Sequence, residues 1–306
     1  MKTIIVVAGA TGNLGDKIIK SLLSKGAAVH AIVRNGTKPE KVTRLERLGV
    51  KVFQVDMSNL EEVTKACIGA ACVVSALAGL REVIIDTQKV LLEAASAAGV
   101  PRFIPSDYSL DFTKFPSGKN RNLDLRREFH LILDKSPIKA TTIFNGAFTE
   151  LLTGDMPLIL FKFKRILFWG SADQRMDFTT MDNTAEFTAN AALDPTTPRF
   201  LRIAGDQVSA REMNGVLTEI TSQRYQLFRP GGLALLGIII KIARKMSPGQ
   251  TELYPAWQGM QYMRNMMSGE GTLVQLDNNR YPDIRWTNAK EMLTQKENAT
   301  IAGLQS

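Results

Sequence analysis

The chain has 306 residues, of which 44% are hydrophobic and 22% are charged, a balance that is typical of a folded globular protein and excludes bulk disorder. Its 38 Lys and Arg residues exceed its 30 Asp and Glu residues, so the formal net charge is +8. A basic surplus favours anionic partners such as nucleotide phosphates, nucleic acid or an anionic membrane surface. The basic residues are scattered without a polybasic run, and on that basis we expect no nucleic-acid partner.

The cysteines and histidines limit the redox and metal chemistry. Cys67 and Cys72 are interpreted as small buried apolar side chains of a reduced, cytoplasmic protein. His30 and His130 have no cysteine or carboxylate partners at ligand spacing, so no metal site is expected. The apolar segment 4–8 runs straight into a Gly-rich turn and is too short for a signal peptide.

The first half of the chain alternates strand and helix signals. Segment 4–8 is a continuous apolar run, as expected of a strand covered on both faces. Ser58 and Glu61 predict a capping box before the helix that follows the third strand. Strands are expected at 4–8, 28–33, 50–55, 72–75, 102–104 and 140–144, with a helix in each interval.

This alternation predicts an α/β fold with a doubly wound parallel sheet. Right-handed crossovers would place every helix N-terminus at the same edge of the sheet, which is the edge where ligands bind in such folds. The second half is less regular. Segment 158–169 predicts a strand or hairpin, with strands at 178–181 and 200–203 and helices from about 183 and at 210–220, 233–245, 256–267 and 288–294.

Segment 233–240 is an apolar run that ends at Lys241. A membrane span needs about 20 such residues, so stable membrane insertion is not expected and a buried helix is the favoured interpretation. The alternative is a helix over 233–245 that lies on a membrane surface, with Arg244 and Lys245 at its end.

A Gly-rich turn, with the spacing G-x-x-G-x-x-G, joins the first strand to the first helix. This position is the one that a phosphate-binding turn requires, because the backbone must turn sharply and approach a pyrophosphate closely. The free N–H groups of the helix N-terminus then face the phosphates. The residues expected to hold the pyrophosphate are Gly9, Thr11, Gly12, Asn13, Leu14 and Gly15.

Arg34 follows the second strand, where a protein that prefers NAD carries Asp or Glu for the ribose 2′-hydroxyl. An arginine there would pair with a 2′-phosphate, so the cofactor is expected to be NADP(H), with Lys38 or Lys41 adding charge. The alternative is a solvated arginine at a strand end.

Three further residues at strand ends are candidates for cofactor contact. Asp56 follows the third strand and would meet the adenine end, although an Asx turn explains it equally well. Ser75 and Ala76 end the fourth strand, where small side chains either admit a cofactor or serve packing alone.

The Gly-rich turn and the end of the second strand, together with three other motifs, resemble the NmrA-like, isoflavone-reductase-like group of atypical short-chain dehydrogenases. The residues that carry the resemblance are the Gly-rich turn, Val33-Arg34, Arg102-Phe-Ile-Pro-Ser-Asp107, Leu125-Arg-Arg127 and Asn145-Gly-Ala-Phe148. The resemblance implies a Rossmann domain over 1–152, rejoined by about 176–204, and a smaller α/β substrate domain made of 153–175 and 205–306. It also implies NADPH as cofactor, with Asn145 and Phe148 near the nicotinamide.

The proton donor is the open question, because no Tyr-x-x-x-Lys pair occurs in this chain. Reductases of the resembling family often have a lysine a few residues before the Arg-Arg pair, and aligning on that pair places Asn122 there. Lys119, Tyr108 and Ser106 are the remaining candidate acids. A solvated lysine and two loop hydrogen bonds are the structural alternatives.

We therefore expect an NADPH-dependent reductase of a small aromatic carbonyl, enone or quinone compound. The alternative is a non-catalytic NADP(H) sensor that acts through a protein partner, since members of the family fall into both groups. Trp257, Met260, Met263 and Met267 share one helical face and predict either an adaptable apolar pocket or core. The loop 107–122 is either a lid or a surface loop.

Overall fold

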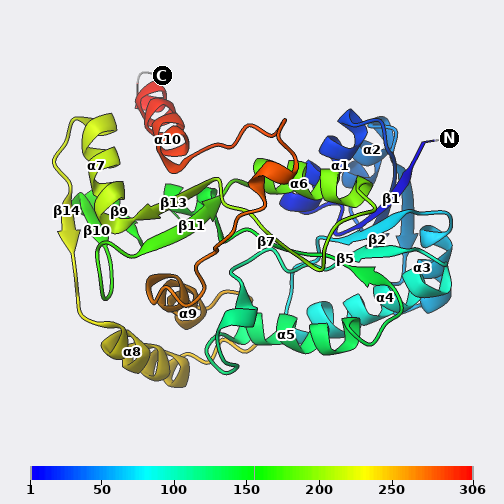
Figure 1. Cartoon of the computed structure of the whole chain (residues 1–306), viewed down its shortest axis with the longest axis horizontal. Helices are drawn as coiled ribbons and strands as arrows, with labels where there is room; N and C mark the ends of the chain where they lie inside the picture. Colours follow the sequence, from blue (N-terminus) through cyan, green and yellow to red (C-terminus); the bar gives the residue numbers. More distant parts are fainter. Residues whose placement is uncertain (1, 155, 305–306) are drawn as a thin grey trace.

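The first half of the chain forms a parallel sheet with a reversal of strand order at its centre. The computed structural model of the chain describes residues 2–154 and 156–304 (Figure 1). Six strands pair in the order β3-β2-β1-β4-β5-β6, and every pair is parallel. The strands are β1 Ile4–Ala8, β2 Ala28–Arg34, β3 Lys51–Val55, β4 Cys72–Ser75, β5 Arg102–Ile104 and β6 Lys139–Ala140. The order reverses between β1 and β4, which is the place where ligands bind in such sheets.

Helices cover both faces of this sheet, as the apolar pattern of β1 requires. One face packs against α1, α2 and α6, and the other against α3, α4 and α5 (Figure 1). Their bounds are α1 Asn13–Ser24, α2 Pro39–Arg47, α3 Leu60–Cys67, α4 Gln88–Ala97, α5 Arg121–Leu133 and α6 Met181–Leu193; a π-helical turn, Glu82–Thr87, precedes α4. The predicted doubly wound α/β fold is confirmed.

The predicted capping box at the start of α3 is wrong. Asn59 is the N-cap, and its side chain accepts hydrogen bonds from the N–H groups of Glu61 and Glu62. Ser58 instead donates its N–H and its hydroxyl to Asp56 Oδ1, at 2.8 and 2.7 Å. Ser58 is occupied by this Asx turn, so α3 begins one residue later, after Asn59. Ser58 and Asn59 can each cap a helix, and the local hydrogen bonds decide between them.

The second half builds three small sheets, in the strand orders β14-β10-β9, β13-β11-β8 and β12-β7. Their strands are β7 Thr142–Phe144, β8 Ala147–Phe148, β9 Ile159–Leu160, β10 Arg165–Leu167, β11 Arg175–Thr179, β12 Phe200–Arg202, β13 Asp206–Ser209 and β14 Gln226–Phe228. The helices are α7 Ala210–Thr221, α8 Leu233–Met246, α9 Ala256–Met267 and α10 Ala289–Leu304. The predicted hairpin over 158–169 is β9 and β10, which pair antiparallel. Strands β8, β13 and β14 were not expected from the sequence.

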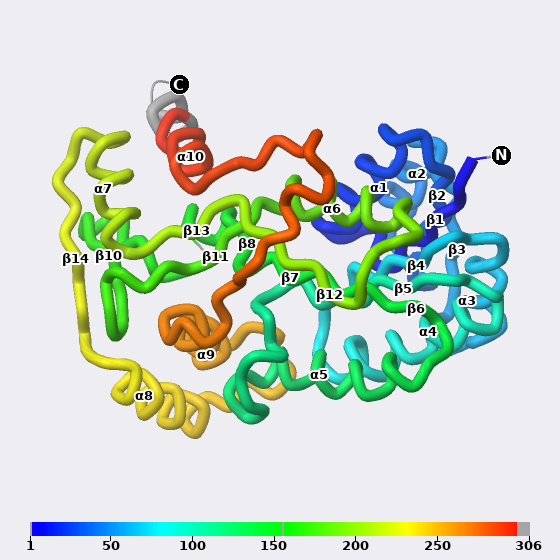
Figure 2. The backbone as a smooth tube through the Cα atoms, in the orientation of Figure 1, coloured from blue at the N-terminus to red at the C-terminus, as the bar shows by residue number. Residues whose placement is uncertain are grey.

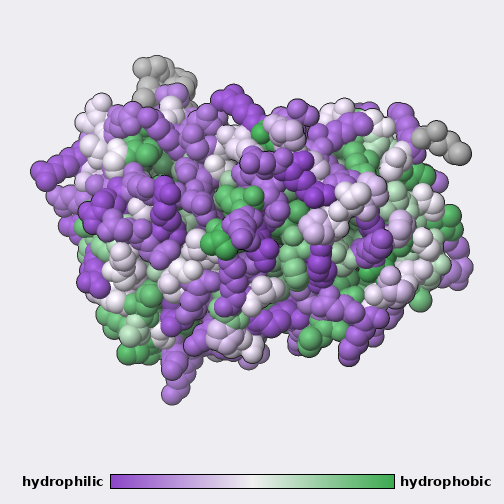
Figure 3. Space-filling view, viewed as in Figure 1, coloured by the Kyte–Doolittle hydropathy of each residue, from purple (hydrophilic) through white to green (hydrophobic). Residues whose placement is uncertain are grey.

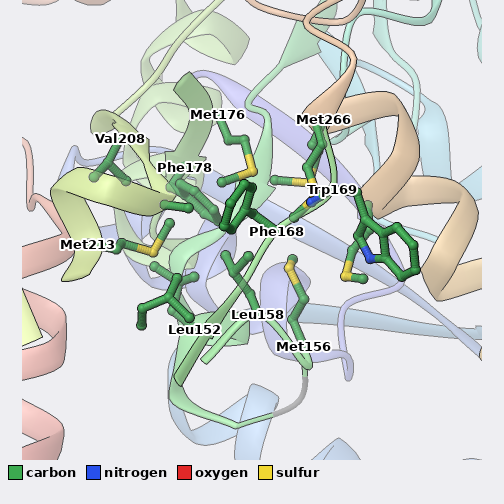
Figure 4. Close-up of a cluster of buried hydrophobic side chains, with 14 of the residues drawn as sticks. Leu152, Met156, Leu158, Phe168, Trp169, Met176, Phe178, Val208, Met213 and Met266 are labelled. Carbon is green, nitrogen blue, oxygen red and sulfur yellow. The ribbon is translucent and has the colours of Figure 1, made fainter. Parts of the chain in front are cut away.

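A separate hydrophobic core fills the space between these sheets and helices (Figure 4). Phe168, Trp169 and Phe178 are among its aromatic side chains, and methionines from several elements fill the gaps around them. Met263 and Met267 of α9 belong to this core and Met260 packs against it. The core interpretation of the α9 methionines is thereby supported.

The chain returns from the second half to the first in two places. β12 pairs in parallel with β7, and α6 packs against α1. The segment between α9 and α10 then runs back beside β12 (Figure 2), where Asp277 N–H donates to the Arg202 carbonyl at 2.7 Å. The first two contacts join 176–204 to the first half, and the third joins the segment after α9 to β12. The division into 1–152 with 176–204 and 153–175 with 205–306 stays our proposal.

The apolar run at 233–240 forms α8, but the expectation of a buried helix is wrong. Of its side chains only Leu236 and Ile240 are buried. None of the helices among the described residues is long and apolar enough to cross a membrane.

Candidate functional site

The Gly-rich turn at the end of β1 is closed by two contacts that only glycine permits. Gly9 has φ +80°, and a Cβ there would lie 2.4 Å from the carbonyl oxygen of Ala76. A Cβ on Gly15 would lie 2.2 Å from the carbonyl oxygen of Gly9. Both obstacles are backbone atoms, so neither can move aside without shifting β4 or α1. The turn is therefore held tightly between α1 and the end of β4.

The start of α1 offers free donors to an anion. Its N-cap is Gly12, which has extended backbone angles and provides no side-chain cap. Thr11, Asn13 and Leu14 are exposed or half-buried around it. An uncapped helix N-terminus carries unsatisfied N–H groups and a partial positive charge, and a phosphate satisfies both. The turn therefore fits a pyrophosphate, as the sequence predicts.

A groove of about 820 Å³ begins at Thr11, Gly12 and Asn13 and continues along α1 and α6. Lys17 and Asp182 join its two walls by an ion pair of 2.6 Å. The turn is thus accessible from outside.

Arg34 lies exposed at the carboxyl end of β2, one strand away from the Gly-rich turn. Its carbonyl accepts a hydrogen bond from Thr37 Oγ1 at 2.6 Å, and no side chain in the described ranges pairs with its guanidinium. Lys38 and Lys41 are exposed at the start of α2. Within the described part of the chain none of these three cations forms an ion pair, and such a cluster fits a 2′-phosphate.

Asp56, at the end of β3, forms the Asx turn with Ser58 that the sequence left open. The hydrogen bonds from the Ser58 hydroxyl and N–H hold the pKa of Asp56 below its usual value. Its carboxylate is therefore charged at neutral pH, and its contact with an adenine ribose stays a prediction.

Two buried oxygens near the end of the sheet lack partners. Ser75 ends β4 and is fully buried, yet its Oγ has no hydrogen-bond partner among the described residues. Asn145 is also fully buried; its Nδ2 donates to Thr184 Oγ1 at 3.4 Å while its Oδ1 has no partner in the described part. An unsatisfied buried oxygen costs about 1–3 kcal/mol, which a bound donor would recover. Ala76, whose N–H donates to Ala8, and half-buried Phe148 lie in the same two segments.

Asn122, where the resembling reductases often carry lysine, is buried at the start of α5. Its Nδ2 donates to the Leu253 carbonyl and its Oδ1 accepts from Arg121 Nε, both at 3.0 Å. Arg126 donates to the carbonyls of Asn122 and Ser106, also at 3.0 Å each. The amide is thus fixed by hydrogen bonds, and it supplies no titratable proton.

The three candidate acids lie in different environments. Ser106 is buried and its hydroxyl donates to the Leu77 carbonyl at 2.6 Å. Tyr108 is buried in the core against α6, and this burial raises its pKa. Lys119 is exposed in the loop before α5. Only Lys119 is open to solvent, and the role of each stays a prediction.

Tyr262 of α9 is a candidate that sequence reasoning missed. Burial raises its pKa to about 12, against the opposing effects of the Arg126 charge and a hydrogen bond to Asn122. Tyr262 is the single tyrosine of α9, and the packing of α9 against α5 brings it beside Asn122. No local signal reveals this, because α5 and α9 are more than a hundred residues apart.

The loop 107–122 is tied down rather than free. Leu110, Phe112 and Phe115 are buried, and Arg127 donates to the Phe112 and Phe115 carbonyls. Asp111 pairs with Arg202 at 2.8 Å. These contacts argue against a lid over 107–115, most of which is packed into the protein, and leave 116–119 as the longest exposed stretch of the loop.

Asp107, at the head of this loop, is fully buried and pairs with His130 Nε2 at 2.5 Å. Thr142 also donates to it, at 2.8 Å. Burial would raise the pKa of Asp107, but the charges of His130 and Arg126 outweigh it and lower the pKa. The loop is therefore anchored to α5 and β7 by a buried charged group.

The histidines and cysteines form no metal site or disulfide among the described residues. Among them no group of His, Cys, Asp and Glu side chains is arranged to hold a metal ion. Cys67 and Cys72 are free and buried, as interpreted from the sequence. Burial raises the pKa of both thiols to about 12.

A Gly-rich turn between the first strand and helix of a doubly wound sheet defines a Rossmann-type protein with a dinucleotide-type phosphate turn. The chain belongs to the NmrA-like family, whose model matches residues 1–213. The recognised resemblance is confirmed.

Similar proteins include pinoresinol reductase 1 of Arabidopsis thaliana, 27% identical over 234 residues that cover 72% of each chain. Among solved structures, AtPrR2 with NADP+ and (+)pinoresinol is similar with a TM-score of 0.80 and 21% identity, covering 97% of this chain and 99% of that one. The NADPH-dependent quinone oxidoreductase QOR2 of Escherichia coli, complexed with NADPH, has a TM-score of 0.73 and 20% identity, covering 95% and 99%. At these identities the solved structures establish the shared fold.

Proposed function

We propose that this chain binds NADP(H) at the carboxyl edge of its parallel sheet and reduces a small aromatic carbonyl, enone or quinone compound. The observation that carries the proposal is Arg34, which has no side-chain partner among the described residues and lies one strand away from the uncapped start of α1. Bound NADPH would supply the hydride. The relatives named above support the choice of cofactor, since AtPrR2 is solved with NADP+ and QOR2 with NADPH.

The chain's own residues would hold the cofactor and deliver a proton. Gly9, Gly12 and Gly15 shape the turn, Arg34 pairs with the 2′-phosphate, and the Ser75 and Asn145 oxygens receive donors from the ligand. With Asn122 in place of a lysine, the acid must come from elsewhere. A quinone needs little acid assistance, and this supports a quinone among the substrate classes.

The test is to mix the purified protein with NADPH and a panel of quinones, aromatic aldehydes and enones, and to follow oxidation of the cofactor. Turnover with any class would establish a reductase. Lys119→Ala, Tyr108→Phe, Ser106→Ala and Tyr262→Phe would then locate the acid, as the variant that lowers kcat at unchanged NADPH affinity.

The second candidate function is a non-catalytic NADP(H) sensor that acts through a protein partner. The buried, hydrogen-bonded Asn122 favours it, because the amide cannot transfer a proton. A sensor predicts unequal affinity for NADP+ and NADPH and no turnover with the panel. NADPH binding without turnover would move the assignment to the sensor.

A further inference from the structure

Helix α8 presents a row of apolar side chains to solvent. Leu235 is 43% exposed, Ile238 54%, Ile242 53% and Met246 80%. Their spacing of three, four and four residues places them on one helical face. We call these four residues the α8 stripe. Large apolar side chains that are about half exposed or more in a continuous row mark a surface that is covered by something else.

The opposite face of α8 anchors the helix to the protein. Leu236 and Ile240 are buried in the core of the second half, and α8 packs against α9. The guanidinium of Arg244 lies 5.1 Å from the centre of the Trp257 ring. The fold therefore fixes the orientation of α8 without using the stripe.

The charges that α8 itself carries have a single sign. Lys241 and Lys245 are exposed and lie along one edge of the stripe, and α8 contains no Asp or Glu. Figure 3 shows apolar side chains next to strongly hydrophilic ones at the lower left, over α8. Pairing of the stripe with a second copy of itself would bring like charges together with no acid on the helix to neutralise them.

We propose that the α8 stripe lies in the interface of an anionic lipid membrane, with Lys241 and Lys245 against lipid phosphates. An apolar row with lysines at its edge is the pattern of a helix that lies in the plane of a membrane surface. The net charge of +8 favours approach to the same surface. With 14 residues, α8 lies on the membrane and does not cross it.

The experiment measures co-sedimentation of the full chain with vesicles of phosphatidylcholine alone and of phosphatidylcholine mixed with phosphatidylglycerol. We expect binding to the mixed vesicles, weakened by salt, and little binding to phosphatidylcholine. Lys241→Gln with Lys245→Gln is expected to lower the partition coefficient by roughly 25-fold, because each lysine near an anionic surface contributes about a fivefold gain. Ile238→Ser with Ile242→Ser is expected to lower it by at least tenfold.

Matched variants separate this surface from general charge and hydrophobicity. Lys135→Gln with Lys139→Gln removes the same charge from exposed sites after α5, and Leu131→Ser removes a side chain that is 64% exposed on α5. Both controls should bind the mixed vesicles like the natural chain, and Lys241→Arg with Lys245→Arg should retain binding.

Three results would overturn the proposal: no binding to mixed vesicles, equal losses in the control and stripe variants, or a dimer that the stripe variants dissociate. The last would assign the stripe to a second copy of the chain. Vesicle binding is measured without cofactor or substrate, so its failure leaves the proposed reductase untouched.

Discussion

Arg34 is the residue on which the choice of cofactor depends. Its guanidinium is exposed, without a carboxylate partner among the described side chains, and it follows the strand next to the phosphate turn. Arg34→Glu should weaken NADPH binding tenfold or more and leave NADH binding unchanged, because a charge-assisted contact contributes about 1.5–3 kcal/mol. Fluorescence titration with both cofactors checks this.

Arg47→Glu is the matched control for that change. Arg47 is exposed in the last turn of α2, at the opposite end of the helix from Lys38 and Lys41, and the substitution makes the same change of charge. It should leave NADPH affinity within about twofold of the natural chain. An equal loss of NADPH and NADH binding in Arg34→Glu would contradict the 2′-phosphate role.

Gly15 is the residue that brings α1 against the turn. In Gly15→Ala the new Cβ would meet the Gly9 carbonyl oxygen at 2.2 Å, so α1 must move away from β1. We expect a loss of about 1–3 kcal/mol in the free energy of unfolding and at least a tenfold loss of NADPH affinity. Urea unfolding and cofactor titration measure the two effects.

Gly215→Ala provides the control within another helix. A Cβ on Gly215 of α7 meets nothing within 4 Å, so alanine should raise stability by about 0.5–1 kcal/mol. If Gly15→Ala changed the free energy of unfolding and the NADPH affinity no more than Gly215→Ala does, the close contact between α1 and the turn would contribute to neither.

At the scale of elements, Arg102 connects β5 to the end of α6. Its buried guanidinium donates to the carbonyls of Ala191 and Ala192 in the last turn of α6 and to that of the C-cap residue, Asp194. These carbonyls have no further helical turn to satisfy them. The arginine therefore holds a helix from the second half of the chain against the first sheet.

Arg102→Met should lower the free energy of unfolding by about 3 kcal/mol, because it leaves buried carbonyls without a donor. Its effect on NADPH affinity should be small, since Arg102 precedes the carboxyl end of β5. Lys139→Met, at an exposed position paired with Arg102 in the sheet, is the control and should change stability by less than about 0.5 kcal/mol. Similar unfolding curves for the two variants would contradict the proposal that Arg102 stabilises the packing of α6 against the first sheet.

At the scale of the whole molecule, two buried thiols and several tyrosines with raised pKa values make the fold sensitive to alkali. Burial raises the pKa values of Cys67, Cys72 and Tyr262 to about 12. In the unfolded chain the thiols lose their protons near pH 9 and the tyrosine near pH 10. The unfolded state therefore binds fewer protons than the folded state between these values, and stability falls as pH rises.

Each such group contributes a slope of about 1.4 kcal/mol per pH unit over that interval. Urea unfolding between about pH 8 and about pH 11 should show this decline. Cys67→Ala with Cys72→Ala should flatten it, although the double variant is less stable at neutral pH. A slope unaffected by removal of both thiols would show that other groups cause the decline.

Much of the first half could be predicted from sequence. The bounds of β1, β4 and β5 match the expected segments, and α9 matches as well, because each is a short apolar run or a periodic helix between clear turn residues. The Gly-rich turn could also be predicted, because the sharp turn of the local backbone requires glycine. The start of α3 was misplaced, because Ser58 and Asn59 are both good helix caps.

The sequence by itself determined the doubly wound sheet, the phosphate turn and the candidate cofactor residues, since periodicity, turn residues and strand ends are local properties of the chain. Only the tertiary structure decided which side chains are buried or brought together. It placed Tyr262 beside Asn122 and left one face of α8 exposed, although the apolar run in α8 had suggested a buried helix. The physical reason is that burial depends on neighbours supplied by distant segments, which no local pattern specifies.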